Sequence, residues 1–186
     1  MALDLRVRGL LDGGDPDLAA TVALEDLGPA ILGWLRALHG PDDGDEVFAD
    51  FAERLWKGLP AFRGESPLRA WAYRIAWNAS HSFRDDAWRR RRQRLATSAA
   101  SNLAARLSRS TDPARDEVRL ARLRTLLPPE DHALLVLRLD REMSWEEIAD
   151  VLSASGTPVS AAALRKRYER VKERLARRAR DEGLVD

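Results

Sequence analysis

The sequence predicts an all-α fold in which two helical domains are joined by a flexible linker. Apolar residues recur with the spacing of amphipathic helices along most of the 186 residues. Gly, Pro and Ser stand where these periodic stretches begin and end, as they do at helix caps. No alternating run of β-branched residues is flanked by hairpin turns, so a sheet is not expected.

The first predicted domain covers residues 17–94 and follows a lead-in at 1–16 that is expected to be loose. Its first helix is predicted over 17–39, with a bend or a break at Pro29. Its second helix is predicted over 43–58, where apolar side chains recur at helical spacing.

A third helix is predicted from residue 67 to about residue 90. Ser66 can cap its first turn, and Pro67 suits its first position. The turn-rich sequence FRGESP connects it to the preceding helix.

The second predicted domain covers 115–180, after a flexible linker at 95–114 and before a short tail at 181–186. Ser144 and Glu147 have the spacing of a capping box, which opens a short helix. A longer helix follows after a turn and is predicted to begin at a cap formed by Ser160.

These last two helices, at 144–152 and 160–180, form a predicted helix-turn-helix. Lys166, Arg170 and Arg177 point away from the apolar side of the second helix. An exposed basic helix supported from behind is the arrangement that enters a DNA major groove. The alternative is a helical hairpin whose surface carries Arg–Glu pairs.

Charge is sorted along the chain, although the formal net charge is only +1. Residues 1–50 hold eleven acidic and three basic residues, whereas residues 160–180 hold nine basic and two acidic residues. A second basic cluster lies at 84–94. This asymmetry favours a polyanionic partner for the basic regions.

Composition and motifs argue against an enzyme, a cofactor site and a metal site. The chain has no Cys, and its three His residues are widely separated. Phosphate-binding Gly-Lys loops and the Gly-x-Ser-x-Gly motif are missing. The sequence also predicts no membrane span and no signal peptide, so a cytoplasmic protein is expected.

The third predicted helix carries an aromatic and basic face opposite the apolar face that is expected to enter the core. Its members are Tyr73, Trp77, His81, Arg84 and Trp88. Aromatic side chains interleaved with bases are typical of surfaces that hold unstacked nucleotides. The alternative is that Tyr73 and Trp77 pack against another helix of the bundle.

Three stretches resemble a bacterial RNA polymerase sigma factor of the extracytoplasmic-function type (group IV). They are DDGDEVFADFAERLWKGLPAFRGESPLRAWAYRIAWNAS at 42–80, LPPEDHALLVLRLDREMSWEEIADVL at 127–152 and VSAAALRKRYERVKERL at 159–175. The resemblance implies sigma region 2 in the first domain and region 4 in the second. It implies a promoter-specificity subunit that binds core RNA polymerase, recognises the −35 and −10 elements and assists −10 melting.

The resemblance also implies partners. These are core RNA polymerase, through its β′ coiled coil and β flap, promoter DNA and the anti-sigma factor that is common in the family. When bound to polymerase, the protein is expected to associate with the nucleoid.

Residue roles follow from the same resemblance. The surface for core polymerase is expected at Asp43, Asp45, Glu46, Asp50 and Arg54. The loop that captures a flipped −10 base is expected at Phe62, Arg63, Gly64, Glu65 and Ser66. Further contacts to −10 DNA are expected from Arg69, Trp71, Tyr73, Arg74, Trp77, Asn78, Arg84 and Trp88. Contacts to the −35 element are expected from Ser160, Arg165, Lys166, Arg167, Arg170 and Arg174.

The sequence departs from the family pattern at three places. Ala49 stands where Gln is common, the turn at 153–158 is lengthened, and Ala162-Ala163 replaces the usual Gly-Thr. The alternative function is a helix-turn-helix regulator that acts without binding polymerase directly.

Overall fold

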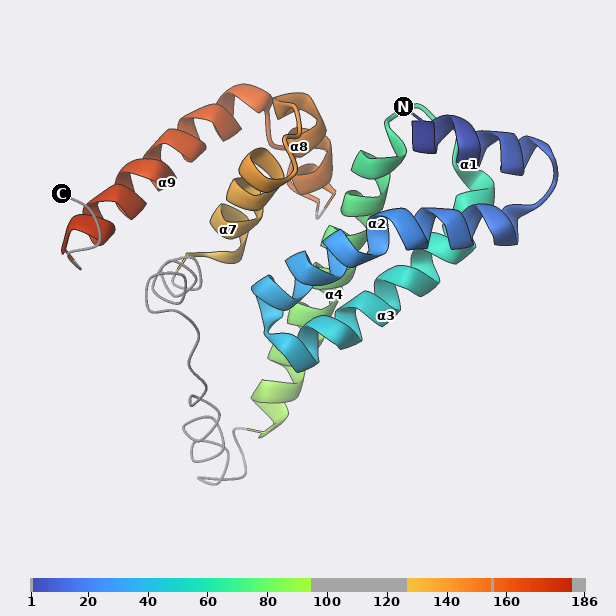
Figure 1. Ribbon diagram of the computed structural model, residues 1–186. Helices are drawn as coiled ribbons and strands as arrows, with labels where there is room; N and C mark the ends of the chain where they lie inside the picture. The colour runs from blue at the N-terminus through green and yellow to red at the C-terminus, as the bar shows by residue number, and fades with distance from the viewer. Residues whose placement is uncertain (1, 95–126, 155, 182–186) are drawn as a thin grey trace.

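The computed structural model describes residues 2–94, 127–154 and 156–181, with side chains of the fourth helix described up to residue 86. All regular elements in these ranges are helical, which confirms the predicted all-α class (Figure 1). The N-terminal elements are α1 (Ala2–Asp12), α2 (Pro16–His39), α3 (Pro41–Gly58), a 3₁₀ turn (Leu59–Ala61) and α4 (Leu68–Arg94). The C-terminal elements are α7 (Pro129–Leu135), a π-helical turn (Val136–Asp140), α8 (Trp145–Ser153) and α9 (Ala161–Asp181). The predicted linker at 95–114 and the start of the second domain lie outside the described residues.

The prediction of a loose lead-in was wrong for residues 2–12, which form α1. Leu3, Val7 and Leu10 follow helical spacing, and Val7 is fully buried against the core. The glycines that suggested looseness instead end this helix, because Gly14 adopts a positive φ of 79°.

Helix α2 is the central helix of the N-terminal part. The side chain of Asp15 caps it by accepting a hydrogen bond from the amide of Leu18 at 3.1 Å, and Pro16 occupies the first turn. The predicted interruption at Pro29 is not seen, since α2 runs unbroken through it.

By length and composition alone, α2 could cross a membrane. Its apolar side chains instead pack in the core of the protein, where Ile31, Trp34 and Leu35 are buried. This is the pattern of a helix that lies at the centre of a folded core.

Helix α3 packs against α2 through its apolar face, on which Val47, Phe51 and Leu55 are buried. The helices approach closely at Gly44, where an added Cβ would lie 2.6 Å from the Cα of Arg36. The opposite face of α3 is acidic and exposed.

Helix α4 begins at Leu68, whose amide donates a hydrogen bond to the carboxylate of Asp4 at 2.7 Å. Sequence reasoning assigned the cap of this helix to Ser66, which lies next to it in the chain. The carboxylate at the start of α4 comes from α1, so contact between two helices satisfies this first amide.

The C-terminal module confirms the predicted caps. The Ser144 hydroxyl accepts from the amide of Glu147 at 3.1 Å, and the Glu147 carboxylate accepts from the amide of Ser144 at 2.7 Å. The Ser160 hydroxyl accepts from the amide of Ala163 at the start of α9. Leu164 and Val171 anchor α9 by burial against α7 and α8.

The two modules lie side by side, with α8 packed on α4 and α7 against α2 (Figure 1). Buried residues from both modules form one continuous hydrophobic cluster. The described part of the chain therefore has a closed arrangement rather than two separate bodies.

We expect Gly44→Ala to destabilise the protein by about 1–3 kcal/mol, because the new methyl group would push against the backbone of α2. The matched control is Gly33→Ala, at an exposed site in α2 where no atom of a described residue lies within 4 Å of the added Cβ. That change should be neutral or stabilising by up to about 1 kcal/mol through helix propensity. Urea unfolding of the two variants measures the difference, and equal midpoints would contradict the close approach.

Candidate functional site

Loop 62–67 joins the 3₁₀ turn to α4 and carries the predicted base-capturing residues. The ring of Phe62 packs on Trp71 with 5.0 Å between centroids. Gly64 adopts a positive φ of 68°, a conformation that glycine favours. Arg63 and Glu65 are exposed and form a weak ion pair at 3.9 Å.

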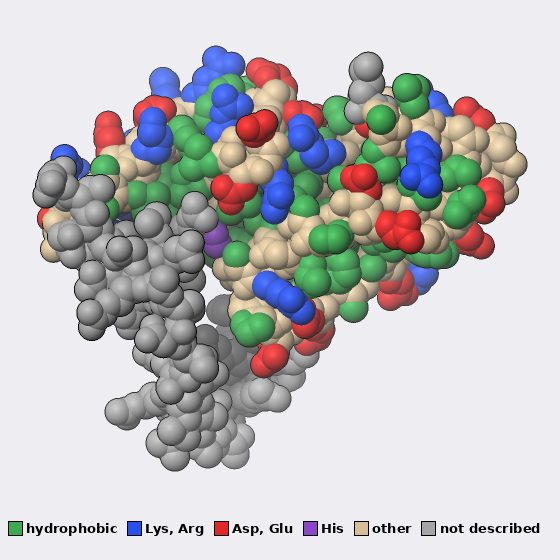
Figure 2. Space-filling model, in the orientation of Figure 1, with side chains coloured by type: hydrophobic (Ala, Val, Ile, Leu, Met, Phe, Trp, Pro, Cys, Tyr) green, Lys and Arg blue, Asp and Glu red, His purple; other side chains and the backbone are tan. Residues whose placement is uncertain are grey.

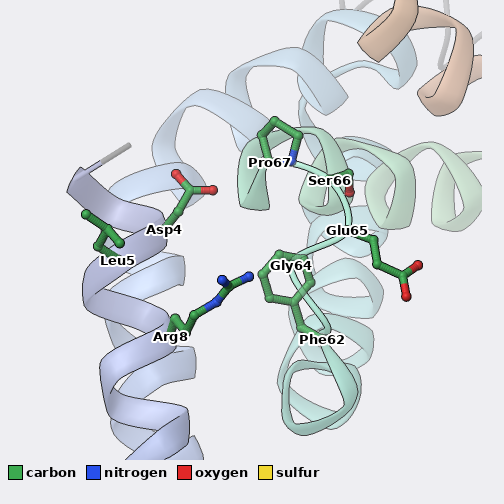
Figure 3. Close-up of a pocket in the computed structure, with 8 residues that line it drawn as sticks. All are labelled: Asp4, Leu5, Arg8, Phe62, Gly64, Glu65, Ser66 and Pro67. Carbon is green, nitrogen blue, oxygen red and sulfur yellow. The ribbon is translucent and has the colours of Figure 1, made fainter.

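A hollow of about 420 Å³ lies between this loop and α1 (Figure 3). Its wall residues are Asp4, Leu5 and Arg8 from α1 and Phe62, Gly64, Glu65, Ser66 and Pro67 from the loop. Sequence reasoning missed the α1 side of this hollow, because residues 1–16 were expected to be loose.

The predicted stacking residues Tyr73 and Trp77 of α4 are about 1% exposed. Trp77 stacks on Trp34 of α2 with 6.0 Å between centroids, and Tyr73 lies 5.2 Å from the same ring. Burial raises the pKa of the Tyr73 hydroxyl. The expectation of an exposed aromatic face is therefore wrong for this closed arrangement, and the alternative of packing within the bundle describes it.

Two arginines predicted to contact −10 DNA instead bridge the two modules. Arg69 donates to the carbonyl of Arg141 at 3.2 Å and to Glu147 at 3.4 Å. Arg84 donates to Glu130 at 3.3 Å, and its guanidinium lies 5.1 Å from the ring centroid of Trp77. The C-terminal module thus covers the face of α4 that was predicted to meet DNA.

The other residues of α4 that were predicted to contact −10 DNA are Trp71, Arg74, Asn78 and Trp88. Trp71, Arg74 and Asn78 are partly exposed. The side chain of Trp88 lies outside the described residues.

Two partly buried histidines lie beside Arg84. His39 shares a 2.7 Å hydrogen bond with the Ser80 hydroxyl, and His81 packs edge-on against Trp77. Burial, and then the charge of Arg84, lowers the pKa of both imidazoles. Within the described ranges, no group of His, Asp and Glu has the geometry to hold a metal ion.

The acidic face of α3 holds the residues predicted to contact polymerase. Arg36 pairs with Asp45 through two hydrogen bonds at 2.6 and 2.9 Å and lowers the pKa of that carboxyl. Arg54 pairs with Asp50 at 2.8 Å. Asp43 and Glu46 are exposed on the same face and leave its net charge negative.

Helix α9 carries the residues predicted to contact the −35 element, and Figure 2 shows basic side chains crowded along it at the upper left. Asp131 of α7, whose side chain is 5% exposed, accepts from Arg167 at 2.5 Å and from Arg174 at 3.1 Å. These two arginines fix α9 to α7. Lys166 and Arg170 are exposed on the outer side.

The remaining predicted −35 residues have local roles in this structure. Ser160 caps α9. Arg165 lies 3.7 Å from Glu146 and close to the ring of Trp145. Sequence reasoning missed Asp131, because a single acidic residue at the start of an apolar stretch gives no signal of its partners.

We expect the charge reversal Glu130→Arg to loosen the contact between the modules, because two guanidinium groups would then face each other. Combining it with Arg84→Glu should restore the attraction. As the chain has no Cys, introduced cysteines at Glu25 and Arg177 can carry a dye pair for energy transfer.

Lower transfer in the single variant and recovery in the double variant is the expected result. The pair is partly exposed, so its contribution should be below about 1 kcal/mol and the population shift about fivefold at most. Unchanged transfer in the single variant would show that this ion pair does not hold the modules together.

The chain is similar to known proteins in both sequence and fold. Residues 24–94 match the family model of Sigma-70 region 2. The chain is also 30% identical over 147 residues to the RNA polymerase sigma factor YlaC of Bacillus subtilis (strain 168). That alignment covers 75% of this chain and 82% of the relative.

Two solved structures have a similar fold. CnrH, in a complex with the cytosolic domain of CnrY, superposes with a TM-score of 0.64 at 23% identity, over 94% of this chain and 95% of that one. The sigma factor RpoE, in a complex with the anti-sigma factor NepR from Bartonella quintana, superposes with a TM-score of 0.66 at 18% identity. This second match covers 82% of this chain and 91% of the other.

Proposed function

Because this chain belongs to the extracytoplasmic-function sigma factors of bacterial RNA polymerase, we propose that it binds core polymerase through α3 and recognises promoters through α9, loop 62–67 and α4. Its contribution is binding rather than covalent chemistry. It anchors the polymerase at the −35 duplex and holds a flipped base while the −10 strands separate.

The proposal rests on the separation of two surfaces of opposite charge. An exposed acidic face lies on α3 in the N-terminal module, and an exposed basic face lies on α9 in the C-terminal module. The acidic face suits a basic protein surface, here assigned to the β′ coiled coil. The basic face suits the phosphate backbone, which supplies most of the affinity in DNA binding.

Within α9, pairing with Asp131 decides which basic residues are available to DNA. Arg167 and Arg174 already share Asp131, whereas Lys166 and Arg170 point outward. We assign direct phosphate or base contacts to Lys166 and Arg170, and a positioning role to Arg167 and Arg174.

The closed arrangement implies a step before the −10 element can be bound along α4. Arg69 and Arg84 are engaged with the C-terminal module. Trp77 is covered by Trp34 of α2 within the N-terminal module, so opening frees the two arginines and not this ring. We therefore assign the closed arrangement to the free protein, and an opened one, with the β flap holding the C-terminal module, to the polymerase complex.

An anti-sigma factor is a second proposed partner. Both solved structures described above contain such a sigma-like chain together with another protein, named as an anti-sigma factor in one of them. A partner of this class that binds both modules would favour the closed arrangement and keep α4 from DNA.

We expect the double variant Asp43→Lys/Glu46→Lys to bind core polymerase about tenfold more weakly or worse, because like charges would face each other. The matched control, Glu25→Lys/Asp26→Lys, makes the same charge change on the exposed side of α2. Pull-down of core polymerase and run-off transcription from genomic fragments measure the two steps. If the wild-type chain neither binds core polymerase nor starts transcripts, the proposed function is wrong and a regulator independent of polymerase becomes the better description.

We expect Lys166→Ala and Arg170→Ala each to weaken promoter binding and to reduce its salt slope by about one, as the loss of one phosphate contact does. Arg167→Ala should instead lower the unfolding midpoint, because it leaves the buried Asp131 with one partner fewer. Fluorescence anisotropy of holoenzyme on a −35 duplex, titrated with salt, measures the DNA contacts, and urea unfolding of the free variants measures the midpoint. A full salt slope in Lys166→Ala and Arg170→Ala would remove α9 from the DNA contact.

A further inference from the structure

The hollow beside loop 62–67 has two walls, and one of them lies outside the matched Sigma-70 region 2. That match begins at residue 24, whereas Asp4, Leu5 and Arg8 belong to α1. Figure 3 shows the side chains of Asp4 and Arg8 reaching from α1 toward the loop. The volume of about 420 Å³ lies within the range of sites that hold small organic groups.

Asp4 connects α1 to the end of the loop. Its carboxylate accepts from the amide of Leu68 at 2.7 Å, directly after Pro67. Burial alone would raise the pKa of Asp4, but the hydrogen bond from Leu68 contributes to lowering it overall. The carboxylate is thus held in its charged form at the start of α4, where the helix dipole favours it.

Arg8 lies directly over the loop glycine. Its guanidinium donates to the carbonyl of Arg63 at 3.4 Å. A Cβ added at Gly64 would lie 1.5 Å from Nη2 of Arg8, so the motif glycine leaves room for this side chain. A guanidinium carries five N–H donors and no acceptor, and Arg8 therefore brings further donors to the rim of the hollow.

We propose that α1 is part of the base-recognition site of this sigma factor. Arg8 donates hydrogen bonds to a carbonyl oxygen of the flipped −10 base, and Asp4 is a positioning residue that holds the loop. Because the guanidinium only donates, it pairs best with a base edge that presents two adjacent acceptors, such as O6 and N7 of guanine. It pairs poorly with adenine, whose N7 adjoins the N6 amino donor. This inference rests on the proposed capture of a −10 base by loop 62–67.

The test uses full-length chain assembled with core polymerase. The probe is a pool of forked DNA fragments in which the unpaired −10 segment is randomised, and bound fragments are sequenced. For the wild-type holoenzyme we expect one position to be depleted of adenine. Arg8→Ala should reduce that depletion about five- to tenfold at this position and leave the others unchanged.

Arg6→Ala is the matched control, because Arg6 is exposed on the same helix and does not line the hollow. It should keep the wild-type base preference. Asp4 is tested by a pair of variants: Asp4→Ala should weaken the preference, and Asp4→Asn, which keeps an oxygen acceptor for the Leu68 amide, should largely restore it. Circular dichroism melting shows whether each variant is folded.

The outcomes separate this inference from the proposed function. If the wild-type holoenzyme selects no sequence at all, the proposed function fails, and the inference fails with it. If the wild type selects but Arg8→Ala selects identically, only the role of α1 is overturned. A uniform loss of affinity for all four bases in Arg8→Ala would also overturn it, since that result indicates a phosphate contact.

Discussion

Trp77 of α4 stacks on Trp34 of α2, and both rings are about 1% exposed. This contact lies on the second face of α4, opposite the face that carries Leu68, Ala72 and Ala79 in the N-terminal core. A helix with two apolar faces needs a partner on each of them. In this structure α2 covers this second face through Trp34, and α8 of the C-terminal module packs on α4 beside it.

Apolar contact, rather than charge, dominates this packing. The buried apolar residues of the two modules form one continuous cluster. The bridging pairs Arg69–Glu147 and Arg84–Glu130 are partly exposed, so each contributes less than about 1 kcal/mol. Among the residues that the structure describes, Trp34 Nε1, Trp77 Nε1 and the Tyr73 hydroxyl have no hydrogen-bond partner. Such unpaired polar groups reduce the net stability of the packing between α2 and α4.

The sequence predicted helices, caps and the helix-turn-helix because these depend on residues close together in the chain. The capping box at Ser144 and Glu147 is an example. It could not predict that Asp4 would cap α4, because these groups are 64 residues apart. Two apolar sectors on α4 were visible in the sequence, but periodicity does not tell whether the second sector packs on protein or on nucleic acid.

Ion pairing with Asp131 divides the basic residues of α9 between two roles that composition cannot distinguish. The sequence predicted six residues of α9 and its cap for one DNA surface. Asp131, almost completely buried, uses Arg167 and Arg174 to hold the helix in place. A buried carboxylate without these partners would be costly, so the two arginines cannot turn toward DNA without loss of stability. The same pair sets the orientation in which Lys166 and Arg170 face outward. Arg167 and Arg174, which hold the helix, and Lys166 and Arg170, which are available for binding, therefore lie on adjacent faces of α9. The position of the buried Asp131 determines which arginines hold the helix.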